Sequence, residues 1–153
     1  MDTNYVFHPT KQSHVQTHPM NIAVLTDGFP PYAVGGAEAV AEAVAQEYSS
    51  QGHDVSVITA VGSEEEAGTE QMDGILLHKI FTSYRYRWAA YKAIRNLQAV
   101  RGVRSILQRE EPDVVHAHNI HNRLSYESLK VAHEMGIPTL LTLHDCMTFD
   151  YGK

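Results

Sequence analysis

Short apolar runs alternate with amphipathic segments along most of this chain. Five runs rich in Val, Ile, Leu and Ala predict strands buried on both faces, over residues 21–26, 54–59, 74–80, 112–118 and 138–143. Apolar residues at helical spacing predict helices over residues 37–48, 84–110 and 124–135, the second of them being one helix or two with a break near Gly102. The alternation favours an α/β fold with a doubly wound, mainly parallel, Rossmann-like sheet.

Two regions depart from this alternation. Residues 1–19 are polar, lack the apolar centre of a signal peptide, and predict a flexible N-terminal extension before a single domain over residues 20–153. The acidic stretch 63–73 predicts a surface loop.

No helix follows the fifth predicted strand, although a doubly wound sheet usually needs one to cover its face. We therefore expect a fragment of a longer protein.

Composition argues against several classes of protein. A formal net charge of -6 at pH 7 argues against a nucleic-acid-binding protein, which needs a basic surface. The single cysteine, Cys146, excludes an internal disulfide framework and fits a reducing compartment. No apolar run approaches the roughly 20 residues that span a bilayer. A cytoplasmic location is expected.

Candidate chemistry begins in the Gly- and Pro-rich loop after the first strand. Gly35 and Gly36 stand directly before Ala37 at the start of the first predicted helix, where backbone N–H groups approach an anion closely. A dinucleotide site would need GxGxxG and an acidic residue after the second strand, and a P-loop would need GK[ST]. Neither pattern is present. The pair predicts a site for a phosphate or another anionic group, unless the loop needs glycine only for its backbone conformation.

Polar residues also follow the fourth and fifth strands. These are His118-Asn119 and His144-Asp145, and they converge with the glycine loop if the first, fourth and fifth strands are neighbours. His116, His118 and His121 have the spacing of a metal-binding motif, so a metal-dependent hydrolase is one alternative function. The other interpretation is that these histidines support their loop by hydrogen bonding.

Four segments in this order resemble the N-terminal domain of the family 4 glycosyltransferases, a retaining group with the GT-B fold. They are MNIAVLTDGFPPYAVGGAE, GHDVSVITA, PDVVHAHNIH and GIPTLLTLHD, and the likeness runs from Met20 to about Asp150. It implies the N-terminal half of a GT-B enzyme that moves a sugar from a nucleotide-sugar donor to a glycan or lipid-linked acceptor with retained configuration. The C-terminal donor-binding domain, with its Glu-x7-Glu element, is absent from this sequence, so we expect the chain to be inactive alone.

The resemblance also implies roles for individual residues. His144 would be the catalytic residue beside the transferred sugar, and the substrate-binding residues would be Gly35, Gly36, Ala37, His118, Asn119 and Asp145. The glycine pair would face the donor diphosphate or a phosphate on the acceptor. No metal and no resident cofactor are implied, since the nucleotide-sugar is a co-substrate. A stand-alone anion-binding Rossmann-like module is the non-enzymatic alternative.

A basic aromatic segment runs from Tyr84 to Arg109. It contains no acidic residue after Tyr84, which contrasts with the acidic balance of the whole chain. Tyr and Trp beside Arg and Lys suit peripheral contact with the inner membrane face or with a polar-lipid acceptor. A solvated helix whose apolar residues pack on the sheet explains the same pattern. The sequence does not identify the sugar, the nucleotide or the acceptor.

Overall fold

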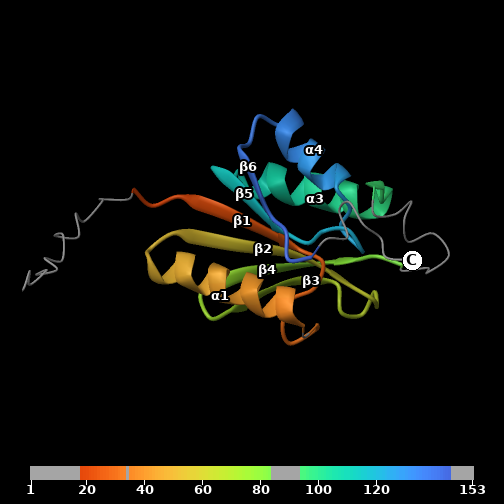
Figure 1. Ribbon diagram of the computed structural model, residues 1–153, viewed down its shortest axis with the longest axis horizontal. Helices are drawn as coiled ribbons and strands as arrows, with labels where there is room; N and C mark the ends of the chain where they lie inside the picture. Colours follow the sequence, from red (N-terminus) through yellow and green to blue (C-terminus); the bar gives the residue numbers. More distant parts are fainter. Residues whose placement is uncertain (1–17, 34, 84–93, 146–153) are drawn as a thin grey trace, which may run out of the picture.

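A central six-stranded sheet organises the computed structural model, which describes residues 18–33, 35–83 and 94–145 (Figure 1). The strand order is β3-β4-β2-β1-β5-β6. The strands are β1 (Asn21–Thr26), β2 (Asp54–Val61), β3 (Gly68–Met72), β4 (Ile75–Phe81), β5 (Val114–His118) and β6 (Thr139–Thr142). All neighbours pair in parallel except β3 and β4, which are antiparallel. The mainly parallel α/β fold expected from the sequence is confirmed.

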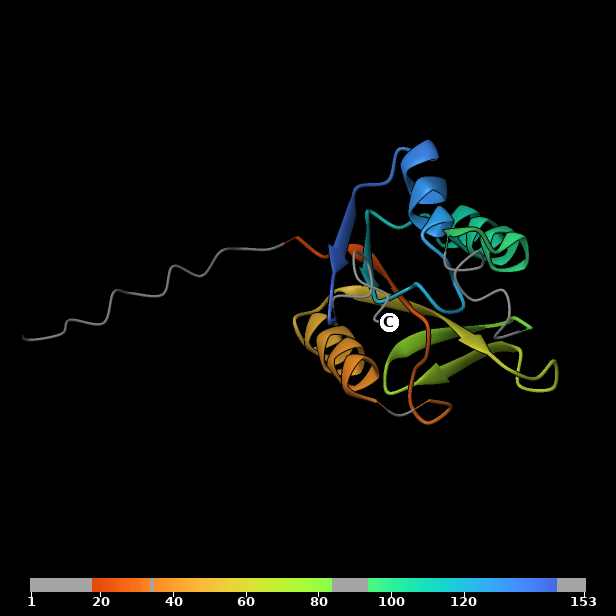
Figure 2. The same ribbon diagram turned by 45° about the vertical axis from the view of Figure 1, so that its right-hand side comes forward.

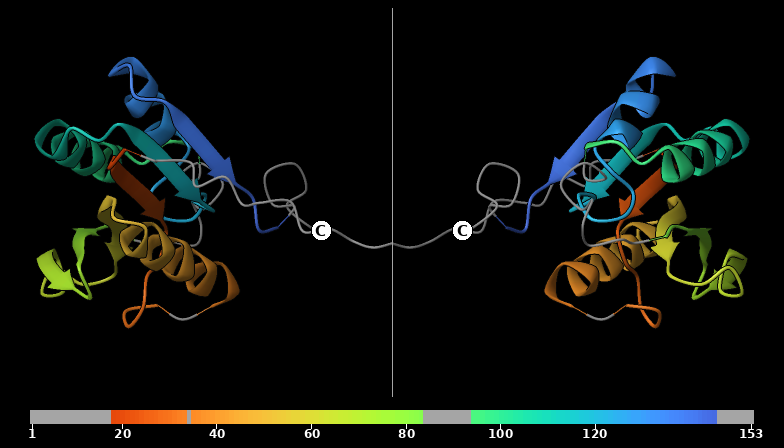
Figure 3. Two further views of the ribbon diagram at one scale, coloured as in Figure 1. Left: turned by 90° about the vertical axis from the view of Figure 1, so that its left-hand side faces the viewer. Right: turned by 90° about the vertical axis from the view of Figure 1, so that its right-hand side faces the viewer.

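Helices cover the two faces of the sheet (Figure 1, Figure 3). Helix α1 (Gly36–Ser50) lies on one face, while α3 (Leu97–Glu110) and α4 (Glu127–Glu134) lie together on the other. On the α1 face, Ala45 packs with Val24 and Val57. On the opposite face, Val103 and Leu107 of α3 pack with inward residues of β1 and β2. The chain crosses the sheet in one direction from β1 to β2 and in the opposite direction from β4 to β5 and from β5 to β6. Right-handed connections therefore put α1 on one face and α3 and α4 on the other.

The strand β3 was not predicted, because its residues Gly68–Met72 fall within the stretch interpreted as a surface loop. It is a mostly exposed edge strand, so it lacks an apolar run. Asp73 and Gly74, with φ of 48° and 83°, form the two-residue turn to β4. Asp-Gly is a strong sequence signal for a hairpin turn with positive φ at both positions. Figure 2 shows this hairpin and β6 at opposite edges of the sheet.

The predicted long helix differs from the structure in where it breaks. Helix α3 runs unbroken through Gly102 and begins after residues 95–96, which are not helical. Gly102 serves close packing instead, because a Cβ there would lie 2.9 Å from Ile80 Cδ1. Residues 1–17 of the expected flexible extension (1–19) and residues 84–93 of the basic aromatic segment lie outside the described residues.

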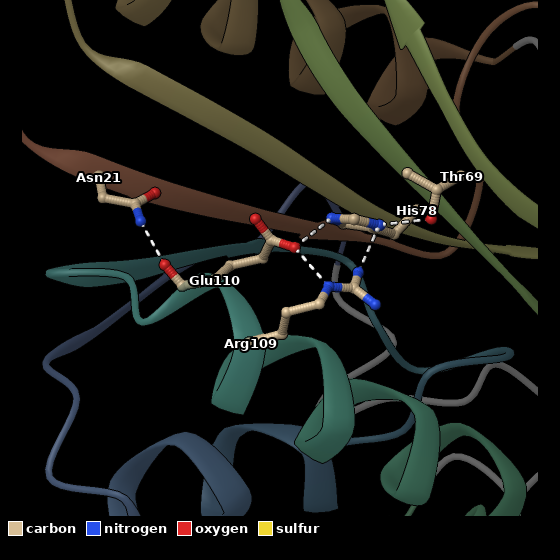
Figure 4. Close-up of polar contacts among 5 residues, drawn as sticks. All are labelled: Asn21, Thr69, His78, Arg109 and Glu110. Atoms are coloured by element: carbon tan, nitrogen blue, oxygen red, sulfur yellow. Dashed lines mark hydrogen bonds and ion pairs between the residues drawn. The ribbon is translucent and has the colours of Figure 1, made fainter.

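A polar cluster fastens the end of α3 to the sheet (Figure 4). His78 of β4 is 1% exposed, with Nε2 3.3 Å from Glu110 Oε1 and Nδ1 2.9 Å from Thr69 Oγ1. Arg109 Nε donates to Glu110 Oε1 at 2.8 Å, and the Asn21 amide donates to the Glu110 carbonyl. Burial lowers the pKa of His78. None of the predicted site residues belongs to this cluster, which joins α3 to β1 and β4.

Candidate functional site

The carboxyl ends of β1, β5 and β6 bring the predicted polar turns to one edge of the sheet. Strand β5 lies between the other two, with His118 paired to Thr26 of β1 and to Thr142 of β6. The turn after β1 therefore lies beside His118 and Asn119, which lie beside His144. This neighbourhood was predicted from the sequence and is confirmed. Helix α1 begins at the same edge, because it returns antiparallel to β1 before the parallel strand β2.

Gly35 and Gly36, at the start of α1, are in different surroundings. Gly35 is the N-cap residue in an extended conformation, and a Cβ there would lie 2.4 Å from Glu38 Oε2. A Cβ on Gly28 would lie 2.6 Å from the Cβ of Ala33. Apart from its chain neighbours and the backbone of its own helix, no described heavy atom lies within 4 Å of the ideal Cβ position of Gly36. Packing within the loop therefore explains Gly28 and Gly35, whereas Gly36 leaves open space at the N-terminus of the helix.

Glu38 occupies part of the region where an anion was expected. Its carboxylate lies close to both Gly28 and Gly35, and an acidic residue in the first turn suits the helix dipole. A phosphate placed against Gly35 would meet this like charge. The open position at Gly36 is therefore the better place for an anionic ligand to contact the helix N-terminus.

The proline-containing part of the loop is tied to the β3–β4 hairpin. The Tyr32 hydroxyl donates to Glu70 Oε1 at 2.9 Å, and Lys79 Nζ donates to the Tyr32 hydroxyl at 2.8 Å. Lys79 also pairs with Glu70 at 3.0 Å. These residues are 38 and 47 positions from Tyr32, so no local sequence signal indicates the contact. The cluster fixes one end of the glycine loop to the rigid sheet.

Asp27, the first residue after β1, holds the loop after β5 in place. It is 8% exposed, and its carboxylate accepts backbone N–H groups from Asn122 at 2.5 Å, Arg123 at 2.9 Å and Leu124 at 2.7 Å. Burial raises the pKa of Asp27, and the three backbone hydrogen bonds oppose that shift. Helix α4 starts at Glu127 rather than at Leu124, because Ser125 has a left-handed φ of 68° that an α-helix does not accommodate. Sequence analysis did not single out this residue.

The turns after β5 and β6 are joined by three hydrogen bonds. His118 Nδ1 lies 2.9 Å from His144 Nε2. The backbone N–H of His144 donates to Asn119 Oδ1 at 3.1 Å, and Asn119 Nδ2 donates to Asp145 Oδ2 at 2.8 Å. His118 and Asn119 are buried, whereas His144 is half-buried and Asp145 is exposed. The four polar residues predicted from these two turns thus form one connected group.

His116 extends this group toward α1. Its Nδ1 lies 3.0 Å from the Tyr48 hydroxyl and its Nε2 lies 2.8 Å from Thr142 Oγ1. The rings of His116 and His118 are 4.1 Å apart between centroids, and those of His118 and His144 are 5.2 Å apart. Burial lowers the pKa of His118 to about 4, with further contributions from His116 and His144. His118 is therefore neutral near pH 7.

The structure separates the third histidine of the H-x-H-x-x-H spacing from the other two. His121 is in the loop after β5, where its Nε2 lies 3.2 Å from the Asn122 side chain, and it contributes to the electrostatics of Asp27. Within the described residues, no three His, Cys, Asp or Glu side chains are grouped so as to hold a metal ion. His116 bonds to Tyr48 of α1 and to Thr142 of β6 and so links these elements rather than its own loop, whereas the contact of His121 with Asn122 lies within the loop after β5.

Comparison with known proteins identifies the family. The chain matches Glycosyltransferase Family 4 over residues 34–152, which contain α1 and every described element after it. The chain belongs to this family. The match agrees with the Rossmann-like sheet and with the resemblance carried by the sequence motifs.

Three curated relatives of this family 4 domain come from Saccharomyces cerevisiae, from strains YJM789, RM11-1a and ATCC 204508 / S288c. Each is called Phosphatidylinositol N-acetylglucosaminyltransferase GPI3 subunit and is 26% identical over 130 residues. The aligned part covers 85% of this chain and 28% of each relative. The chain therefore spans less than a third of the length of these relatives.

An apolar surface groove of about 460 Å³ runs beside the histidines of the family 4 domain. It is lined mainly by one side of α1, including Val40, Val44 and Tyr48, and reaches His116 on β5. Val40 is 44% exposed, because Ala41 and Ala45 are the α1 residues that face the sheet. Leu140 on β6 is also exposed, at 52%.

The described part of the basic aromatic segment consists mainly of the amphipathic helix α3 and makes ion pairs with acidic residues. Arg104 Nη2 lies 2.7 Å from Glu134 and Arg95 Nε lies 3.4 Å from Glu127. Val103 and Leu107 are buried against the sheet, as the alternative of a solvated helix requires. Among the described helices, none combines the length and the hydrophobicity that a membrane crossing needs.

Proposed function

We propose that this family 4 domain is the acceptor-side half of a glycosyltransferase. It would act in transfer of a sugar from a nucleotide-sugar donor to a lipid-linked or glycan acceptor, with retained configuration. The observation that carries the proposal is the convergence of the α1 N-terminus, His118-Asn119 and His144-Asp145 at the carboxyl edge of the sheet in a chain that matches this family. Turnover would require a donor-binding domain, which supplies most contacts to the nucleotide.

The leaving diphosphate is the charge that the domain would have to stabilise. The first N–H groups of α1 have no intrahelical partners, and the helix dipole adds partial positive charge there. Gly36 leaves room for a phosphate oxygen to approach these donors without the clash that a side chain would cause. Preorganised donors aimed at a developing negative charge stabilise a transition state, and no metal or resident cofactor is part of the proposal.

His144 would contact the transferred sugar rather than act as a nucleophile. It is half-buried at the edge of the sheet, with its ring bonded to His118 at the end of β5 and its backbone N–H bonded to Asn119 in the following turn. A held imidazole orients a hydroxyl by hydrogen bonding, which fixes the sugar relative to its leaving group. Asp145 is exposed beside it and is proposed to contact the acceptor or the sugar.

A lipid-linked acceptor is favoured over a purely polar one by two observations. The curated relatives are named for N-acetylglucosamine transfer to phosphatidylinositol. An apolar groove also lies next to the histidines, bordered by Val40 and Val44, and suits a hydrocarbon chain. Peripheral association with the cytoplasmic membrane face follows from such an acceptor and is part of this proposal.

The proposal predicts a sugar-transfer activity that depends on Gly36. The chain is fused to a family 4 donor-binding domain and assayed with radiolabelled nucleotide-sugars, UDP-N-acetylglucosamine first, and vesicles containing phosphatidylinositol. We expect labelled lipid from the fusion and none from the chain alone. Gly36→Val should lower transfer at least roughly tenfold, the effect of about 1.4 kcal/mol on the barrier. The free energy of unfolding of the Gly36→Val fusion should differ from that of the unsubstituted fusion by less than about 0.5 kcal/mol.

Gly62→Val is the matched control for that substitution. Gly62 directly follows β2 and is not part of α1, and its Cβ would be in ordinary contact with Arg123. The control should retain transfer. A folded fusion that transfers no sugar to phosphatidylinositol or to a panel of glycan acceptors would overturn the proposal, and vesicle flotation of the chain tests the membrane contact in the same preparation.

A further inference from the structure

One ring nitrogen of His144 is already engaged by the protein. His144 Nε2 lies 2.9 Å from His118 Nδ1, and the backbone N–H of His144 is held by Asn119 at 3.1 Å. No hydrogen bond joins His144 Nδ1 to any residue in the part of the chain that the structure describes. Only Nδ1 is therefore available to a ligand. It donates a hydrogen bond if it carries the ring proton and accepts one if Nε2 carries it.

The burial of His118 decides between the two proton arrangements. His118 is 1% exposed and its Nε2 has no hydrogen-bond partner among the described residues. If His144 donated to His118 Nδ1, the neutral His118 ring would carry its proton on Nε2 and leave a buried donor unpaired. If His118 donates from Nδ1, its Nε2 is an unpaired acceptor instead. Buried N–H groups without partners are rarer in proteins than acceptors that lack one, so the second arrangement is favoured.

We propose that His118 and Asn119 are positioning residues that hold His144 in the tautomer protonated at Nδ1. His118 donates to His144 Nε2, Asn119 accepts the His144 backbone N–H and donates to Asp145, and the imidazole presents an N–H donor at the sheet edge. The left-handed φ of 43° at Asn119 is one that asparagine tolerates better than most residues. This role differs from the direct substrate contact that the resemblance implied for both residues.

The tautomer of His144 determines whether its ring donates a hydrogen bond to a ligand or accepts one from it. A His144 that donates from Nδ1 orients a lone pair of a sugar hydroxyl and has no basic nitrogen left to accept a proton, because Nε2 is occupied. The identity of the group that receives the donor rests on the proposed function. The tautomer itself rests only on the contacts between the β5 and β6 turns.

Long-range ¹H–¹⁵N correlation NMR of the histidine-labelled chain at pH 7.5 tests the tautomer. We expect the His144 ring to show a protonated Nδ1 and an unprotonated Nε2. His118→Phe keeps an aromatic ring but removes the donor, so His144 should change toward the Nε2-protonated pattern. His118→Asn places an amide donor near the position of Nδ1 and should restore the Nδ1-protonated pattern. Backbone amide spectra establish that each variant is folded.

Asn119→Ala separately tests the hydrogen bond from the His144 backbone N–H to the Asn119 side chain. Loss of its side chain should shift the His144 backbone amide resonance while leaving amides of α3 unchanged. A wild-type His144 protonated at Nε2, or a folded His118→Phe variant with an unchanged His144 pattern, would overturn the proposal. Failure of sugar transfer in the fusion with an intact Nδ1 pattern would reject the proposed function and leave the tautomer standing.

Discussion

Asp27→Ala is expected to lower the free energy of unfolding by about 3–5 kcal/mol, a large part of the stability of a domain of this size. The Asp27 carboxylate accepts the backbone N–H groups of residues 122–124 at 2.5–2.9 Å. Alanine would leave these donors, of which the Leu124 N–H is buried and the other two are partly buried, without an acceptor, and each unsatisfied buried group costs about 1–3 kcal/mol. Urea denaturation followed by circular dichroism measures the loss.

Two further variants separate hydrogen bonding from other effects of that substitution. Asp27→Asn retains one acceptor oxygen for Arg123 and Leu124 but turns an amide toward the Asn122 N–H, so an intermediate loss is expected. Glu66→Ala removes a carboxylate from an exposed loop and should change stability by less than about 0.5 kcal/mol. Equal stability of Asp27→Ala and wild type would mean that the loop after β5 does not depend on this carboxylate.

Acidification is expected to destabilise the domain through His118 by up to about 3 kcal/mol. The pKa of His118 is about 4 in the folded protein because of burial, compared with 6.5 for an unperturbed histidine. Between these values the unfolded chain binds a proton that the folded chain does not. Stability therefore falls as the pH decreases from about 6.5 to 4, by roughly 1.4 kcal/mol for each pKa unit before screening by solvent.

The pH dependence of His118→Asn isolates this contribution. Unfolding free energies from urea titrations at pH 7.5 and 4.5 should differ less in this variant than in the wild type. Part of the dependence should remain, because burial also lowers the pKa values of His78 and His116. His133→Asn, at an exposed position on α4, should retain the wild-type dependence. An unchanged pH dependence in His118→Asn would show that His118 does not carry this linkage.

Periodicity was sufficient for most of the fold because the parallel strands are buried and apolar. β1 and β2 are almost wholly buried, so their composition alone distinguishes them from loops. The edge strand β3 has no such signal, since its polar residues contact solvent and its partner lies on one side only. The start of α4 was also misplaced, because the left-handed φ of 68° at Ser125 gives no signal in the helical spacing of the apolar residues.

The site shows the same division between local and long-range information. The order of strands and the residues that follow them predict that the glycine loop, His118-Asn119 and His144-Asp145 are neighbours. The directions in which the side chains of the site point could not be predicted from the sequence. Nothing local indicates that His118 turns toward His144, that the Glu38 carboxylate lies over Gly28 and Gly35, or that Gly36 remains open. These contacts join residues whose relation depends on the completed sheet and on the path of the loop.

The central claim is that the α1 N-terminus and His144 border one crevice that receives the diphosphate end of a nucleotide-sugar. Titration of the ¹⁵N-labelled chain with UDP-N-acetylglucosamine, followed by amide NMR at millimolar ligand, tests it directly. We predict that Gly36, Ala37 and His144 shift together along one binding curve, and that Gly36→Val abolishes the shift at His144. Shifts confined to one of these segments, or to residues on the α3 face, would contradict the claim.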